Sequence, residues 1–104
     1  RQMCIRDRYG HRRDISGYAR ALEWFDSEIS KIIGKLRKDD LFILTADHGN
    51  DPTWSGSEHT RENVPILIIG ASPKTNKKVN FVDVAATVAH FMGSPVLGPG
   101  KSIL

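Results

Sequence analysis

The sequence is poor in cysteine and has no long apolar run. Its single cysteine, Cys4, cannot form an internal disulfide, which fits a reducing compartment. No run of apolar residues reaches the length of a membrane span or of the hydrophobic part of a signal peptide. We therefore expect a cytoplasmic protein that has no membrane partner.

Several motifs that would carry a nucleophile, a phosphate group or a catalytic metal are missing. The sequence contains no Gly-x-Ser-x-Gly nucleophile elbow, no glycine-rich phosphate loop and no His-Glu-x-x-His metal motif. We therefore expect that this chain carries no catalytic nucleophile and that any nucleophile is supplied by a segment upstream of it.

There is little excess charge outside the first eight residues. The chain has 15 basic and 12 acidic residues, and its net charge is +3. Residues 1–8 hold three arginines and one aspartate, so the remainder has 12 basic and 11 acidic residues. A nearly neutral remainder does not favour binding to nucleic acid, and we expect no such partner.

Residues 1–8 read Arg-Gln-Met-Cys-Ile-Arg-Asp-Arg, which resembles the conceptual translation of a transposase adapter used in sequencing libraries. The alternative is an ordinary polar N-terminus that happens to match. We treat the segment as non-native and leave it out of the fold prediction, as one does for an expression scar. We expect the natural protein to extend upstream of Tyr9, with residues 9–104 forming part of one domain.

The first half of the chain predicts a long helix followed by a buried strand. Between residues 16 and 38 the apolar residues recur at steps of four and three, which indicates one face of a helix. They are Tyr18, Leu22, Phe25, Ile29, Ile32 and Leu36. Residues 41–46 form a short, almost wholly apolar run, typical of a strand that is covered on both faces. A central parallel strand fits this run best.

The second half predicts a loop, a strand and a helix. Residues 47–63 are polar and rich in turn formers, and residues 64–69 predict a second buried strand. Asn80 can cap a helix that follows. The apolar face of this helix is Phe81, Val84, Ala85, Val88 and Phe91. The order helix, strand, loop, strand, helix predicts half of an α/β sandwich.

Asp47 and His48 are candidate metal ligands because they directly follow the first predicted strand. Open α/β sheets bind ligands outside the carboxyl ends of their strands. Consecutive residues of a strand point to opposite faces, so both side chains can reach one ion only if the chain turns here, which Gly49 makes easy. The alternative is a plain turn in which Asp47 caps backbone amides and His48 is solvated.

Two further histidines are expected near the same end of the sheet. His59 lies in the long loop, and His11 just precedes the long helix. A mixed set of imidazole and carboxylate groups suits zinc, manganese or iron. Taken singly, each histidine could be an ordinary surface residue. His90 lies within the last predicted helix, apart from the others, and we interpret it as structural.

Three segments together resemble phosphopentomutases of the alkaline phosphatase superfamily. They are residues 9–13 (Tyr-Gly-His-Arg-Arg), 45–53 (Thr-Ala-Asp-His-Gly-Asn-Asp-Pro-Thr) and 59–62 (His-Thr-Arg-Glu), the last followed by Val-Pro. Cofactor-independent phosphoglycerate mutases share Thr-Ala-Asp-His-Gly-Asn but typically continue with Ala-Glu. The resemblance implies a partial α/β/α sandwich of the alkaline phosphatase type, formed by the C-terminal part of the core domain.

The resemblance also implies a site and a reaction. Asp47 and His48 would bind one of two Mn²⁺ ions, and His11 and His59 the other. The family's phosphorylated threonine, its cap domain and an N-terminal aspartate ligand would lie upstream. Another family aspartate falls at Arg6, inside the suspected adapter. The implied reaction interconverts the 1- and 5-phosphates of ribose or 2-deoxyribose, a step of nucleoside catabolism. The alternatives are a phosphoglycerate mutase-like enzyme and a non-catalytic metal-binding module.

Overall fold

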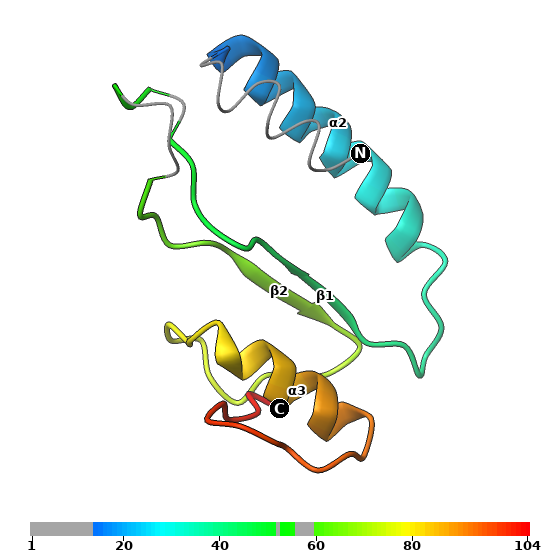
Figure 1. Ribbon diagram of the computed structural model, residues 1–104. Coiled ribbons are helices and arrows are strands. Elements are labelled where there is room, and N and C mark those ends of the chain that lie inside the picture. Colours follow the sequence, from blue (N-terminus) through cyan, green and yellow to red (C-terminus); the bar gives the residue numbers. More distant parts are fainter. Residues whose placement is uncertain (1–13, 52, 56–59) are drawn as a thin grey trace. The chain divides into compact units, whose positions relative to one another are not determined.

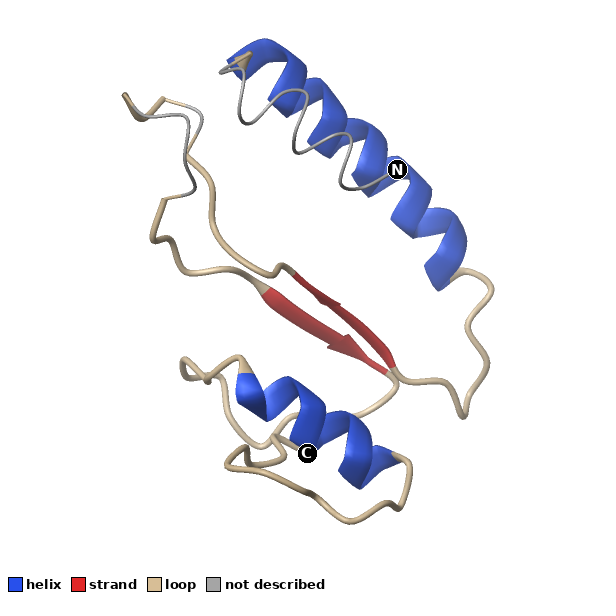
Figure 2. Cartoon of the chain, viewed as in Figure 1, coloured by secondary structure: helices blue, strands red, loops and turns tan. Residues whose placement is uncertain are grey.

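The computed structural model describes residues 14–51, 53–55 and 60–104. The elements are helix α2 (Ile15–Ile33), strands β1 (Phe42–Thr45) and β2 (Ile66–Ile69), and helix α3 (Val82–Phe91), as shown in Figure 1. These elements form two compact units, which are described separately. One contains α2 and the segment 46–65, called the site loop below, and the other contains both strands, α3 and the residues that follow it. Figure 2 shows the site loop as the long connection between the strands.

Helix α2 confirms the predicted long helix but ends five residues earlier than expected. It starts at Asp14, whose carboxylate accepts a hydrogen bond from the Gly17 N–H at 2.8 Å. It ends at Gly34, whose N–H bonds to the carbonyls of Ser30 and Ile32. Glycine is a poor helix former, so the helix stops there although the apolar spacing continues. The cations at 35–38 therefore lie beyond the last helical turn, which holds Lys31.

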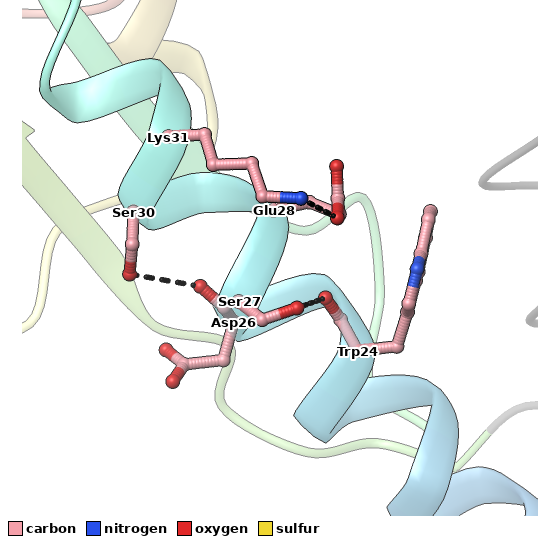
Figure 3. A network of polar contacts seen from close by, with 6 residues as sticks. All are labelled: Trp24, Asp26, Ser27, Glu28, Ser30 and Lys31. Carbon is pink, nitrogen blue, oxygen red and sulfur yellow. Dashed lines mark hydrogen bonds and ion pairs between the residues drawn. The ribbon is translucent and has the colours of Figure 1, made fainter.

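The surface of α2 carries short-range polar contacts, shown in Figure 3. The Ser27 hydroxyl donates to the Trp24 carbonyl at 2.7 Å, and the Lys31 ammonium pairs with the Glu28 carboxylate at 2.6 Å. Of the predicted apolar face, Ile29 is buried, whereas Leu22 is 53% exposed. The exposed ion pair contributes little to stability, so α2 depends on the part of its apolar face that is covered.

Strands β1 and β2 confirm the two predicted strands, but their relation differs from the prediction. They pair antiparallel, with Phe42 opposite Ile69 and Thr45 opposite Ile66. Parallel neighbours need a crossover connection, usually a helix, and the site loop contains no helix among its described residues. Nor are the strands covered on both faces, since β1 is only half-buried and Leu67 of β2 is exposed. The one described neighbour of β1 is thus antiparallel, and its expected place as a central parallel strand stays a prediction.

Helix α3 confirms the last predicted helix but not its cap. The residue before it is Phe81, and no side-chain hydrogen bond caps this end. Asn80 takes part through its backbone instead, because its N–H donates to the Asp83 carboxylate at 2.8 Å. The acidic residue in the first turn thus satisfies a donor at the start of the helix, which is half of a capping box.

The last five residues lie beside α3 (Figure 1), and polar side chains of the helix bind their backbone. The Asp83 carboxylate accepts from the Lys101 N–H at 2.9 Å, and the Thr87 hydroxyl accepts from the Ile103 N–H at 3.2 Å. Thr87 is fully buried and Ile103 nearly so. The His90 ring lies 2.7 Å from the Ser102 hydroxyl, which gives this histidine a local structural contact.

The side of α3 that is buried in the described chain differs from its predicted apolar face. The buried residues of the helix are Ala86 and Thr87, on the side that meets the tail. In the described chain Phe81 is 64% exposed and Val88 is 44% exposed, although both belong to the predicted face. The prediction of the buried face was wrong because apolar spacing does not reveal that a polar residue such as Thr87 can be buried by satisfying backbone groups.

Asp83 should make the tail sensitive to acid. The N–H groups of Lys101 and Asn80 hold the pKa of Asp83 below its ordinary value of 3.8. A carboxylate whose pKa is lower in the folded chain stabilises the fold above the unfolded value, and this contribution is lost as pH falls through the folded value. We expect the tail contact to be complete above pH 3.8 and to weaken below it.

This pH dependence can be followed through the amide resonances of Lys101 and Asn80 between about pH 5 and 2. In the variant Asp83→Asn, the resonances of the two amides should no longer shift together as the pH falls. In Glu23→Gln, an exposed change on α2, the shift should persist. An unchanged pH-dependent shift in Asp83→Asn would contradict the role of Asp83 in the pH dependence of the tail contact.

Candidate metal centre

The site loop begins with the two candidate ligands that directly follow β1. The chain bends at Asp47 and His48, and the His48 Nε2 lies 3.6 Å from the Asp47 Oδ1. The Asp47 side chain is 63% exposed and that of His48 is 26% exposed. Asp47 Oδ1 also accepts from the His48 N–H at 3.1 Å. The bend therefore brings the two side chains together, as binding to one ion requires.

The His48 ring is oriented by the backbone of the next residue. Its Nδ1 lies 3.0 Å from the Gly49 carbonyl oxygen, which can only accept, so Nδ1 carries the proton. In the neutral ring this tautomer leaves the lone pair on Nε2, the atom that faces Asp47. Metal-binding histidines commonly donate their other ring N–H to a carbonyl in this way. The chemistry of this pair therefore fits a metal ion of the kind that binds nitrogen and oxygen.

The other two predicted ligands, His11 and His59, lie outside the described residues. Within residues 14–51, 53–55 and 60–104, no group of three or more histidine, cysteine, aspartate or glutamate side chains is placed to hold a metal ion. The described part of the centre is thus the pair Asp47 and His48, and the roles of His11 and His59 stay predictions.

Asp51 organises the turn that follows the pair. Its carboxylate accepts from the Thr53 hydroxyl at 2.6 Å and from the Thr53 N–H at 2.8 Å. These two bonds, the hydroxyl first, hold the pKa of Asp51 below its ordinary value. The Trp54 N–H donates to the Asp51 carbonyl at 3.2 Å. The described hydrogen bonds of the Asp51 carboxylate therefore stabilise the turn and do not involve the Asp47–His48 pair.

Residues near the C-terminal end of the site loop contact residues near its N-terminal end. The Asp51 N–H donates to the Thr60 hydroxyl at 2.8 Å, which links residues nine positions apart. Gly49 is buried against Glu62, and a Cβ on Gly49 would lie only 2.3 Å from the Glu62 Cβ. The nearby Asn50 Nδ2 is buried without a partner among the described residues. Thr60 and Glu62 belong to the motif at residues 59–62, but the sequence assigned them no contact, because their contacts depend on how the loop closes.

The variant Gly49→Ala should separate the two ends of the site loop. A methyl group at 2.3 Å from Glu62 cannot be accommodated, so the two ends of the loop must separate. We expect the Asp51 amide to exchange with solvent about 10-fold faster, as its hydrogen bond to Thr60 is lost. Amide exchange measured by NMR tests this expectation.

Gly34→Ala is the matched control, because Gly34 has a helical φ of −65° and its nearest atom, the Ser30 oxygen, would lie 3.7 Å from an added Cβ. It should leave the Asp51 exchange rate unchanged. Similar exchange in both variants would show that the approach of Gly49 to Glu62 does not hold the loop.

Comparison with known proteins places the chain in a class of enzymes. It belongs to the Metalloenzyme superfamily, whose family model matches residues 5–96. This membership implies a metal cofactor, which agrees with the chemistry of the Asp47–His48 pair. The match begins within the segment set aside in the fold prediction, at residue 5.

The chain is also similar to curated phosphopentomutases, which confirms the resemblance based on its motifs. It is 50% identical over 99 residues to the phosphopentomutase of Pectobacterium carotovorum subsp. carotovorum (strain PC1), covering 92% of this chain and 24% of that protein. The identity is 44% for the phosphopentomutase of Vibrio cholerae serotype O1 (strain ATCC 39541 / Classical Ogawa 395 / O395), with the same coverage. The chain therefore spans about a quarter of the length of these relatives.

In the part of the chain that the structure describes, neither helix is long and apolar enough to cross a membrane.

Proposed function

We propose that the chain is the C-terminal part of a phosphopentomutase that interconverts ribose 1-phosphate and ribose 5-phosphate and their 2-deoxy equivalents. The observation that carries this proposal is the similarity to phosphopentomutases over 92% of the chain. The placement of Asp47 next to His48 supports it, since this pair belongs to the motif shared with the family. The enzyme acts in the cytoplasm on a small-molecule substrate.

The metal centre of this enzyme uses two manganese ions. Asp47 and His48 hold one ion, and His11 and His59 hold the other. When bound, the ions neutralise charge on the transferred phosphoryl group and orient the attacking oxygen. Asp47 would contribute an anionic oxygen, and the Gly49 carbonyl, which accepts from His48 Nδ1, makes Nε2 the ring nitrogen that would bind the ion.

The reaction proceeds through a phosphothreonine that is supplied from upstream of this chain. Its phosphoryl group passes to the free hydroxyl of the pentose monophosphate, which gives a bisphosphate. The other phosphoryl group then returns to the threonine after the sugar reorients.

The described elements belong to a partial α/β/α sandwich within the core domain of the whole enzyme. The mixture of helices and strands supports this assignment, as does membership of the Metalloenzyme superfamily. Residues 9–104 form the C-terminal part of this domain, and residues 1–8 derive from an adapter.

The test is to extend the gene upstream of the Tyr9 codon and assay the whole protein. Conversion of ribose 1-phosphate to ribose 5-phosphate in the presence of Mn²⁺ is the expected result. The genomic reading frame should also encode an aspartate five residues before His11. Phosphoglycerate mutase activity without pentose phosphate turnover would favour the related mutase. A native start codon directly before Tyr9 would favour a small metal-binding module.

A further inference from the structure

Two oxygen acceptors lie near the His48 ring, and the Gly49 carbonyl is the nearer one. It lies 3.0 Å from Nδ1, within hydrogen-bond distance, whereas the Asp47 Oδ1 lies 3.6 Å from Nε2, beyond that distance. A neutral imidazole ring has one N–H, so the two acceptors compete for it. The position of the Gly49 carbonyl therefore decides which ring nitrogen keeps its lone pair.

The backbone of Gly49 packs against Glu62. Gly49 is buried, and an added Cβ would lie 2.3 Å from the Glu62 Cβ and 2.9 Å from both its Cα and its backbone nitrogen. Gly49 does not have a left-handed φ, so lack of space, and not backbone conformation, requires glycine here. The Glu62 backbone is itself held, because its N–H donates to the Thr60 carbonyl at 3.1 Å.

We propose that Glu62 is a positioning residue for His48, because its Cβ and backbone hold the Gly49 carbonyl where it keeps the ring proton on Nδ1. This inference rests on the proposed function, in which Nε2 binds a metal ion. Without the packing, the Gly49 peptide can rotate and its carbonyl can leave Nδ1. Asp47 then becomes the better acceptor, and a proton on Nε2 blocks the nitrogen that would bind the ion.

The Cβ of Glu62, and not its carboxylate, should be the decisive feature. Glu62→Gly removes the Cβ that packs on Gly49, whereas Glu62→Ala removes the carboxylate and keeps the Cβ. Gly49→Ala forces the two backbones apart, and Gly34→Ala in the C-cap of α2 is its control. In the double variant Gly49→Ala/Glu62→Gly, the new methyl group occupies the space that the Glu62 Cβ leaves.

The experiment uses the full 104-residue chain with ¹⁵N-labelled histidine, free of metal, at one fixed pH of about 8.5, where an ordinary histidine is neutral. The chemical shifts of the two ring nitrogens report the tautomer, and His48→Gln assigns the signals. In the original chain the Nδ1–H tautomer should predominate. In Glu62→Gly and Gly49→Ala the ratio of Nδ1–H to Nε2–H should fall about 2- to 10-fold, as expected for one hydrogen bond. Glu62→Ala and Gly34→Ala should match the original chain.

Three results would overturn the inference: a predominant Nε2–H tautomer in the original chain, an unchanged ratio in Glu62→Gly, and an equal fall in Glu62→Ala and Glu62→Gly. The last result would mean that the carboxylate acts and not the packing. A higher ratio in the double variant than in Gly49→Ala supports the inference. If Gly49→Ala loses its signal dispersion, the pair of variants at position 62 decides.

Trace amounts of Mn²⁺ test the proposed metal centre separately. If His48 binds the ion through Nε2, the paramagnetic ion should broaden the Nε2 signal more than the Nδ1 signal, because Nε2 lies nearer to it. Absence of broadening at His48 would overturn its role as a ligand. The role of Glu62 in setting the tautomer would still be decided by the variants, since their measurement contains no metal.

Discussion

Replacing Asp47 by asparagine in the whole enzyme should weaken Mn²⁺ binding by at least about 100-fold, because even residues that only orient a metal ligand typically contribute 10- to 100-fold to affinity. Asparagine keeps the shape and one carbonyl oxygen but removes the negative charge that attracts a divalent cation. The Asp47 Oδ1 lies 3.6 Å from the His48 Nε2, so the charge is lost where both groups would bind. Turnover at a fixed, moderate Mn²⁺ concentration should fall at least as much.

The dependence on metal concentration distinguishes a lost ligand from a damaged fold. Raising Mn²⁺ should partly restore the activity of Asp47→Asn, whereas a folding defect would not respond. Asp39→Asn, an exposed aspartate in the turn after α2, is the matched control and should retain the original activity. Activity of Asp47→Asn within about 3-fold of the original at the same metal concentration would exclude Asp47 as a ligand.

The sequence predicted the elements more reliably than their ends, directions and buried faces. The spacing of apolar residues located α2, but it continued past Gly34 and so hid the end of the helix. The apolar run of β1 indicated a strand without revealing the direction of its partner. That direction fits the connection, since a loop with no helix among its described residues joins antiparallel neighbours more readily than parallel ones.

Site residues could be predicted where they directly follow a strand in the sequence. Contacts that form only when the site loop closes could not be predicted. Asp47 and His48 were found because they follow a strand directly. The contact of the His48 ring with the Gly49 carbonyl is also local, but it requires the bend to be known. The bond from Asp51 to Thr60 joins residues nine positions apart, and no periodic pattern encodes such a pair. A threonine beside a candidate histidine ligand was the one signal available in the sequence.

The 104-residue chain by itself should have no mutase activity and should bind Mn²⁺ with a dissociation constant of about 1 mM or weaker, that is, with no more than about 4 kcal/mol of binding free energy. Under the proposed function the chain keeps four of the six protein ligands that the family resemblance implies, so each ion retains two. Metal sites normally hold an ion through three or four protein ligands, and the two lost ligands are carboxylates whose charge contributes to affinity.

Calorimetric titration with Mn²⁺ tests this expectation once circular dichroism has shown that the sample is folded. His48→Ala should remove the heat of binding of one of the two ions, whereas His90→Ala should remove none, because His90 lies in α3 and contacts Ser102. Binding of two ions at micromolar affinity or better would mean that other carboxylates replace the missing aspartates. Asp14 and Asp51 are poor replacements, since Asp14 caps α2 through the Gly17 N–H and Asp51 accepts two bonds from Thr53. Tight binding would therefore point to Glu58, and loss of the second ion in Glu58→Gln would identify it as a ligand.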